Sequence, residues 1–187
     1  MSRHGGTGGW SVRAGLAIGI ALTSILPGCY TNAHPVTYGV AGPCQHTTTL
    51  WMDPQFTIRE IRAVNDAADA WSRATPECWK PTYTYTDADV RIVFADSEAD
   101  IQDEHPSNTV GLWAPTPRRI WLTRQDRTLT EIRTISAHEF GHYLGLQHNE
   151  EVPRGTSLMD PYIQNDYPMG PASDVPVGDV RAYWALG

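Results

Sequence analysis

Apolar residues recur at helical spacing in the segment that follows Thr57. Thr57 and Glu60 stand three residues apart, which is the spacing of a capping box and marks the start of a helix. Every third or fourth position after it is apolar, so that one stripe of this helix is expected to pack on a sheet. The stripe ends before Pro76 and consists of Ile58, Ile61, Val64, Ala68 and Trp71.

Two further helices are predicted in the C-terminal half of the chain. Thr128 and Glu131 repeat the capping-box pattern and open a helix whose core side is formed by Ala137, Phe140 and Leu144. A shorter helix is predicted over 176–186, with three residues facing inward, namely Val177, Val180 and Trp184.

Segments rich in β-branched and aromatic residues predict the strands of this sheet. They are bounded by turn residues such as Asp53-Pro54 and Pro115-Thr116-Pro117. The predicted strands are Thr47–Met52, Thr82–Thr86, Val90–Phe94, Thr109–Ala114 and Arg119–Thr123.

The N-terminal part of the chain differs in composition from the rest. A chain of 187 residues with 41% hydrophobic content is long enough to bury the core of one ordinary globular domain. Residues 1–28, however, contain two arginines, no acidic residue and the apolar run Ala14–Leu26, which is too short for a membrane span. We therefore expect an exported protein, with a signal peptide at 1–28, a tether at 29–43 and one domain at 44–187.

The end of the leader predicts a lipid anchor. Leu26-Pro27-Gly28-Cys29 resembles the lipobox of bacterial lipoproteins, in which the cysteine becomes the lipidated first residue of the mature chain. The protein would then face the periplasm or the cell surface from a bacterial membrane. Pro27 is unusual in such a box, and the alternative is a plain secretory signal that is cut nearby and releases the protein.

Assigning Cys29 to the anchor leaves two of the three cysteines. In an oxidising compartment we expect Cys44 and Cys78 to form a disulfide. The formal net charge of the chain is -7, and the sequence has no basic cluster and no Gly-rich phosphate loop. These features argue against a nucleic-acid partner.

Residues 138–148 carry the candidate chemistry, because they have the pattern HExxHxxGxxH. His138 and His142 lie four residues apart and therefore present two imidazoles on one face of a helix. Gly145 permits the left-handed turn that ends a helix, so that His148 can return as the third ligand of a zinc site with one open position. Glu139 follows the first ligand, where its carboxylate can take a proton from a water that zinc activates.

The extended motif and a methionine in the turn Ser157–Pro161 together resemble the signature of the metzincin zinc peptidases. The similarity reaches further toward the matrixins, whose first helix and following strands resemble Trp71-Ser72, Thr75-Pro76 and Asp89–Phe94. The resemblance implies an α+β fold with a twisted, mostly parallel sheet of four to five strands, two long helices, a zinc cleft, a Met-turn and a C-terminal helix.

The resemblance also implies roles for individual residues. It implies one catalytic zinc, with Glu139 as general base and Met159 as an apolar floor beneath the three histidines. It places Thr109–Ala114 at the rim of the cleft, where this strand pairs with extended substrate and Gly111 permits close approach of the substrate backbone. The alternative for that segment is an ordinary edge strand.

The sequence departs from the known metzincin families after the third histidine. Asn149 stands where matrixins usually have serine and astacins have glutamate. Tyr162 lies three residues after Met159, whereas the tyrosine that reaches the metal in astacins and serralysins lies two residues after; we expect a structural role for it, with contact to zinc or the oxyanion as the alternative. Cys44 also has an alternative role, as a thiolate that silences the zinc in the manner of a matrixin propeptide.

Additional metal sites are not supported by the sequence. The remaining histidines are scattered and give no structural zinc cluster. An acidic run is expected to be a solvated loop because it lacks the spacing of a calcium loop, with Ca²⁺ binding as the alternative. This run consists of Asp96, Glu98, Asp100, Asp103 and Glu104.

The expected function is that of a monomeric, membrane-tethered zinc endopeptidase that hydrolyses peptides or proteins outside the cytoplasm. One alternative is a lipoprotein that uses the same fold to bind a partner or to sequester metal without turnover. Glu139 argues against that alternative, since zinc binding alone does not require it. Another alternative is a peptidase that acts on cell-wall peptides.

Overall fold

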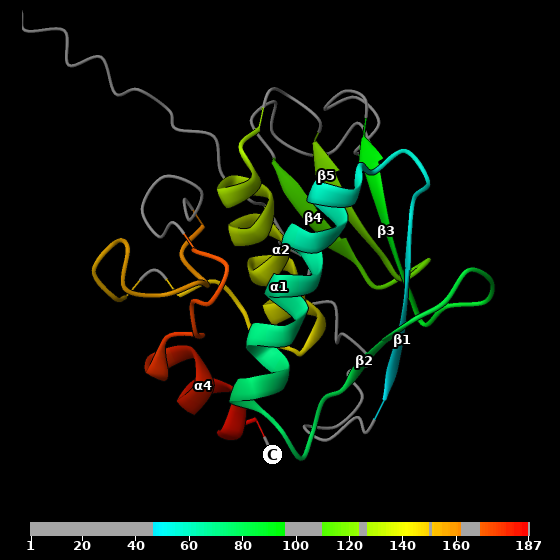
Figure 1. Cartoon of the computed structure of the whole chain (residues 1–187). Coiled ribbons are helices and arrows are strands. Elements are labelled where there is room, and N and C mark those ends of the chain that lie inside the picture. Colours follow the sequence, from blue (N-terminus) through cyan, green and yellow to red (C-terminus); the bar gives the residue numbers. More distant parts are fainter. Residues whose placement is uncertain (1–46, 96–109, 124–126, 150, 162–168, 187) are drawn as a thin grey trace, which may run out of the picture.

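The computed structural model describes residues 47–95, 110–123, 127–149, 151–161 and 169–186. Helices α1 and α2 lie side by side on one face of a five-stranded sheet, and α4 lies near their ends (Figure 1). The elements are β1 (Thr48–Met52), α1 (Ile58–Ala74), β2 (Pro81–Tyr83), β3 (Val90–Ala95), β4 (Gly111–Ala114), β5 (Arg119–Thr123), α2 (Leu129–Tyr143) and α4 (Val177–Trp184). The predicted α+β fold is confirmed. No helix within the described ranges is long and apolar enough to cross a membrane.

The sheet has the strand order β2-β1-β3-β5-β4. The first four strands in this order pair in parallel, and β4 pairs antiparallel with β5 at one edge. The prediction of a mostly parallel sheet is therefore confirmed. The segment predicted at the rim of the cleft, with an ordinary edge strand as the alternative, lies at an edge of the sheet, and its pairing with substrate stays a prediction. Strand β4 begins at Gly111, while Thr109 lies outside the described residues.

Both long helices begin at the predicted capping boxes. The Thr57 hydroxyl accepts a hydrogen bond from the Glu60 backbone at 3.3 Å, and the Glu60 carboxylate accepts one from the Thr57 backbone at 2.6 Å. Thr128 and Glu131 form the same pair at 3.2 and 2.7 Å. Each box satisfies two backbone N–H groups that the first turn of a helix leaves without partners, and this sets the register of α1 and α2.

Polar contacts lock the packing of α1 against α2. The indole of Trp71, which is fully buried, donates a 2.8 Å hydrogen bond to the Ala137 carbonyl. Arg133 is 6% exposed and donates to the Asp66 carboxylate at 3.0 Å and to the Met169 carbonyl at 2.9 Å. These bonds join α1, α2 and the segment that precedes α4.

The start of α1 corrects one prediction. Ile58 is 70% exposed and therefore does not belong to the buried stripe, whereas Val64, Ala68 and Trp71 do. Ile58 is the first residue of the helix, and the core position at this end is taken by Phe56, which stacks on Phe94 with ring centroids 3.7 Å apart.

Strand β2 covers Pro81–Tyr83 and is shorter than the predicted Thr82–Thr86. The Thr84 backbone still donates to the Leu50 carbonyl at 3.0 Å, but the Thr86 backbone donates to the Thr84 hydroxyl at 3.3 Å. A local bond of this kind offers the backbone an alternative to a strand ladder, and so the strand ends early.

The buried face of α4 is also different from the predicted one. Val177 and Trp184 are 65% and 46% exposed, while Asp179 and Tyr183 are buried. Val180 is partly buried against the core, as expected. Relative to the predicted orientation, α4 is rotated about its axis because Asp179 makes hydrogen bonds to the methionine turn Ser157–Pro161.

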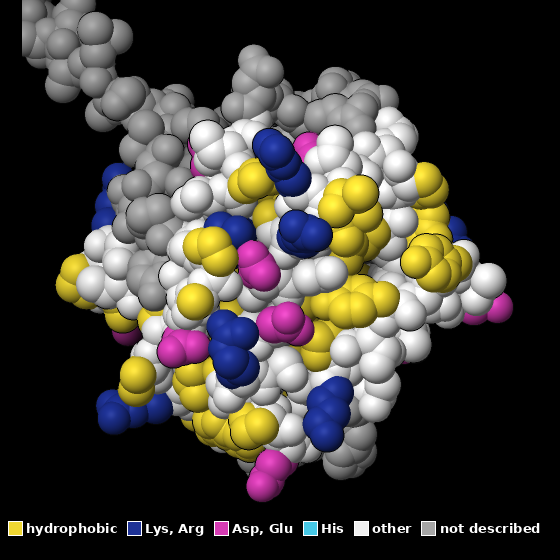
Figure 2. All heavy atoms as spheres, viewed as in Figure 1, with side chains coloured by type: hydrophobic (Ala, Val, Ile, Leu, Met, Phe, Trp, Pro, Cys, Tyr) yellow, Lys and Arg dark blue, Asp and Glu magenta, His cyan; other side chains and the backbone are white. Residues whose placement is uncertain are grey.

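An apolar pocket of 480 Å³ lies between β1, the start of α1 and the segment after β2. Figure 2 shows apolar side chains gathered in this region beside the charged surface of α1. Its walls include Trp51, Ile61, Tyr83 and Tyr85, and none of the motif histidines lines it.

Candidate metal centre

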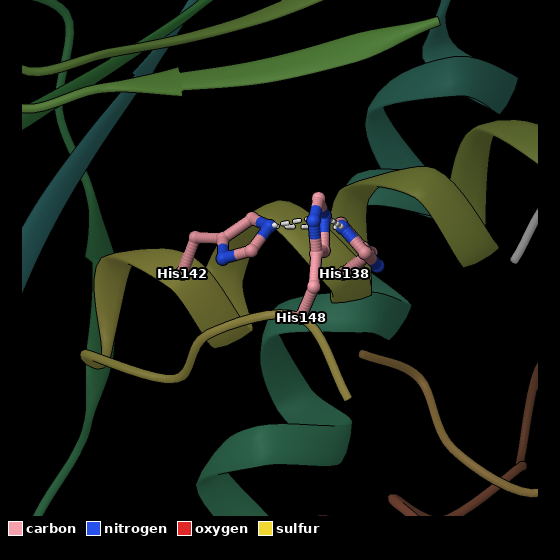
Figure 3. Close-up of side chains that lie close together, drawn as sticks. All are labelled: His138, His142 and His148. Atoms are coloured by element: carbon pink, nitrogen blue, oxygen red, sulfur yellow. Dashed lines mark hydrogen bonds between the residues drawn. The ribbon is translucent and has the colours of Figure 1, made fainter. Parts of the chain in front are cut away.

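Three histidines point their Nε2 atoms at a common position. His138 and His142 come from α2, and His148 comes from the segment after it (Figure 3). The Nε2 atom of His138 lies 2.9 Å from that of His142 and 3.2 Å from that of His148, and the third separation is also 3.2 Å. The structure therefore brings together the three predicted ligands.

The second nitrogen of two rings fixes their orientation. Nδ1 of His138 lies 2.5 Å from the Leu158 carbonyl, and Nδ1 of His142 lies 2.8 Å from the Leu146 carbonyl. A carbonyl only accepts, so both Nδ1 atoms carry the proton and both Nε2 atoms carry the lone pair. Lone pairs that face one another repel unless a cation lies between them.

The histidine geometry fits zinc. Zn–N bonds of 2.0–2.1 Å in a tetrahedral arrangement place the ligand nitrogens about 3.3 Å apart. The observed separations of 2.9–3.2 Å are close to that value. In zinc sites, a ligand histidine usually donates its second ring N–H to a carbonyl or carboxylate, as His138 and His142 do here.

Gly145 adopts the left-handed conformation that was predicted to end α2. This residue has a φ of 99°, which lies in the left-handed region, and its N–H donates to the His142 carbonyl at 3.0 Å. The Leu146 N–H then donates to the Gly141 carbonyl at 3.0 Å. The chain reverses at this turn, which allows His148 to meet the other two ligands.

Burial keeps the histidines neutral. It is the main cause that lowers the pKa of His138 well below its usual value, and the neighbouring His142 and His148 lower it further. Burial also lowers the pKa of His142 to about 3 and that of His148 to about 4, the latter against an opposing effect of Asp160. All three rings are therefore neutral at neutral pH, with one nitrogen of each ring unprotonated, which is the form that binds metal.

Glu139 is fully buried at the side of α2 that faces β4. A Cβ atom built on Gly111 would lie 2.8 Å from Glu139 Oε1 and 2.5 Å from Ile135 Cγ2. Gly111 was expected to permit close approach of a substrate backbone. The structure shows that Gly111 permits the close approach of β4 to α2. Approach of a substrate backbone at this position stays a prediction.

Met159 lies behind the ligand-bearing part of α2. A Cβ atom on Gly141 would overlap the Met159 sulfur, so the thioether packs directly on the backbone between the motif residues. Met159 is 1% exposed, and its carbonyl accepts a 2.8 Å hydrogen bond from the Asn149 backbone, one residue after His148. This contact ties the methionine turn to the segment that carries the third histidine.

Asp179 supports the same turn and was not recognised from the sequence as a site residue. Its carboxylate accepts hydrogen bonds from the Ser157 hydroxyl at 2.5 Å and from the Leu158 backbone at 2.6 Å. The Ser157 hydroxyl in turn accepts from the Met159 backbone at 2.9 Å. Burial raises the pKa of Asp179, and both hydrogen bonds oppose this shift. The sequence signal that could have identified Asp179 is a single acidic residue among the mostly apolar residues of a short helix.

Several residues with predicted roles lie in parts of the chain that the structure does not describe. Cys29, Cys44 and Tyr162, together with the acidic run, lie outside the described residues. Cys78 is buried and disulfide-bonded, with its partner beyond the described part of the chain, so its pairing with Cys44 stays a prediction.

A protein-family model matches the part of the chain that contains the three histidines. The family model described as Matrixin matches residues 116–186, the part of the chain that holds the zinc motif, the methionine turn and α4. No curated protein sequence matches the chain significantly. The matched segment confirms the resemblance to matrixins that the motif predicts.

Two solved structures share the fold. The crystal structure of myroilysin is 12% identical with a TM-score of 0.50, and the match covers 87% of this chain and 91% of that chain. The archaemetzincin of Methanopyrus kandleri is also 12% identical with a TM-score of 0.50, and the match covers 78% of this chain and 97% of that chain. The matrixin match, the shared fold and the histidine cluster together support a zinc metallopeptidase.

Proposed function

We propose that this chain is a metzincin-type zinc endopeptidase that acts outside the cytoplasm with Glu139 as its general base. The observation that carries the proposal is the convergence of three Nε2 atoms, together with a fully buried carboxylate on the residue that follows His138. The histidines alone would suffice to hold a metal ion. Glu139 directly follows the first of them in the sequence, and burying its carboxylate costs stability. A role in proton transfer explains why a glutamate stands at this position.

His138, His142 and His148 would hold the zinc ion and leave one position open for water or substrate. When bound, zinc supplies a Lewis acid that polarises the scissile carbonyl and lowers the pKa of a water. The Glu139 carboxylate takes the proton as the water oxygen bonds to the carbonyl carbon. It then gives the proton to the leaving amine as the C–N bond breaks.

Strand β4 is the element that we propose for substrate binding. It lies at the edge of the sheet, and its antiparallel partner β5 occupies only one of its sides. An extended peptide could pair with the other side through main-chain hydrogen bonds. This placement would carry the scissile bond past Glu139, because β4 is the strand that contacts this residue.

The location of the protein is proposed from the leader alone. Residues 1–28 have the composition of an export signal, and Cys29 ends a lipobox-like sequence. A lipidated Cys29 would hold the enzyme at a bacterial membrane. Cys29→Ala should then move the protein from the membrane fraction to the soluble fraction and abolish incorporation of labelled fatty acid. Unchanged partitioning and no labelling of the wild type would contradict a lipid anchor.

The proposed activity is tested by mass spectrometry of a diverse peptide mixture incubated with the zinc-loaded protein. A chelated sample and a Glu139→Ala sample serve as controls. New internal cuts confined to the untreated wild type support an endopeptidase and map its side-chain preference. Their absence from a folded, zinc-containing protein would favour the binding scaffold that keeps the fold without turnover.

A further inference from the structure

Strand β4 follows one face of α2. Ile135, Glu139 and Tyr143 are spaced four residues apart and therefore lie on the same side of the helix. Gly111 faces the first two of these residues, and Trp113, two positions further along the strand, packs edge-on against Tyr143 with ring centroids 5.2 Å apart. Residues two apart lie on the same side of a strand, so one side of β4 rests on this face of α2.

At Gly111 the contact leaves no room for a side chain. A Cβ atom there would lie 2.5 Å from Ile135 Cγ2, 2.8 Å from Glu139 Oε1 and 3.2 Å from Glu139 Cγ. The backbone of Gly111 is that of an ordinary strand residue paired with Leu122, and its φ is not in the left-handed region. The position therefore requires glycine for space and not for backbone freedom.

We infer that Gly111 is a positioning residue for Glu139, which fixes where the carboxylate lies relative to the three histidines. Any side chain at this position has to displace both Glu139 Oε1 and the Ile135 methyl group, or push β4 away from α2. The backbone of Gly111 and the flank of α2 thus define the space in which the carboxylate sits. This inference rests on the proposed function, in which Glu139 transfers the proton.

Kinetic analysis of Gly111→Ala in the zinc-loaded protein tests the inference. A displacement of a catalytic group by about 1 Å lowers the rate by roughly a hundredfold, so we expect a loss of this size in kcat. Zinc content should stay within about twofold of the wild type, because the ligands are untouched. KM should stay within the same range, because the added Cβ points at α2 and leaves the main-chain edge of β4 free to pair with substrate. Gly178→Ala is the matched control, since a Cβ there meets nothing within 4 Å. A kcat of Gly111→Ala within about twofold of the wild type overturns the inference, as does a loss confined to KM or to zinc content.

A second readout does not depend on activity. We would measure the unfolding midpoints of Gly111→Ala, Glu139→Ala and the double variant. All of these proteins also carry Ile135→Leu, which removes the contact of Ile135 Cγ2 with a Cβ at position 111. Together with Ile135→Leu alone they form a double-mutant cycle. Leucine moves the branch from Cβ to Cγ and so vacates the Cγ2 position at nearly constant volume. We expect Gly111→Ala to lower the midpoint less when the Glu139 side chain is absent, because the two residues are in contact.

If Gly111→Ala lowers the unfolding midpoint equally with Glu139 present and with Glu139→Ala, the inference is overturned. If Gly111→Ala does not give folded protein, recovery of folding in the double variant supports it and failure to recover overturns it. A wild-type protein that cuts no peptide contradicts the proposed activity, and the unfolding cycle still measures the contact between Gly111 and Glu139. Failure of the function and failure of the inference are thereby distinguished.

Discussion

The carboxylate of Asp179 in α4 accepts a 2.6 Å hydrogen bond from the backbone N–H of Leu158. The carbonyl of the same Leu158 accepts the hydrogen bond from Nδ1 of His138. A single residue of the methionine turn therefore connects the C-terminal helix with the first metal ligand. The orientation of the His138 ring depends in this way on a carboxylate that lies outside the zinc motif.

Asp179→Ala should destabilise the protein and weaken metal binding. The substitution leaves the buried Ser157 hydroxyl and Leu158 N–H without their acceptor, which costs about 3 kcal/mol of unfolding free energy. Loss of ligand support of this kind lowers metal affinity by roughly tenfold to a hundredfold. Urea unfolding and competition with a zinc-binding dye measure the two effects.

Asp174→Ala is the control for this prediction. Asp174 pairs with Arg73 at 3.4 Å on the surface, and its side chain is 80% exposed. An exposed pair of this kind contributes less than about 1 kcal/mol. If Asp179→Ala changes stability and zinc affinity no more than Asp174→Ala does, then Asp179 does not support the site.

Gly141→Ala should destabilise the fold through overpacking. The added Cβ would overlap the Met159 sulfur and lie 3.2 Å from Trp71 Cζ2. Both neighbours are fully buried and have little freedom to move, so we expect a loss of about 1–3 kcal/mol. Chemical denaturation of this variant beside Gly178→Ala measures the effect. Stability equal to that of the wild type would mean that the methionine is not packed on the zinc helix.

The metal-free protein should lose stability in mild acid. Burial lowers the pKa of His142 to about 3 and that of His148 to about 4 in the folded state, from an ordinary value of 6.5. Below about pH 6.5 the unfolded chain therefore binds protons at these positions that the folded chain does not bind. Stability should fall from that pH down to the folded values, by at most about 1.4 kcal/mol per pH unit for each histidine.

Urea unfolding in the presence of a chelator at several pH values between 5 and 8 tests this dependence. A His142→Ala variant should show a smaller slope, because one of the titrating groups is gone. The same slope in both proteins, or none in the wild type, would contradict a neutral, buried histidine cluster.

Local sequence patterns predicted the parts of the structure that local interactions determine. The capping boxes at Thr57 and Thr128 are hydrogen bonds within one helical turn, and Gly145 has the positive φ that its place in the motif requires. The spacing of His138 and His142 follows from helix geometry alone. The ligand set could therefore be derived before any tertiary contact was known.

The remaining features depend on contacts between distant segments. Asp179 and Leu158 are 21 residues apart, and the bond between them turns α4 so that Val177 faces solvent. Periodicity in an eight-residue helix carries too little information to predict that rotation. The requirement for glycine at position 111 is set by Glu139 on another element, which the composition of β4 does not reveal.

In the proposed mechanism, zinc and Glu139 act together in peptide hydrolysis. We would measure kcat/KM for one peptide that the wild type cuts, together with the zinc content of wild type and Glu139→Gln. We expect a loss of about 10²–10⁴-fold in Glu139→Gln with zinc content unchanged, because the amide keeps the shape of the side chain and cannot accept the proton. A Glu139→Gln protein that holds zinc and cleaves the peptide as fast as the wild type would contradict this mechanism.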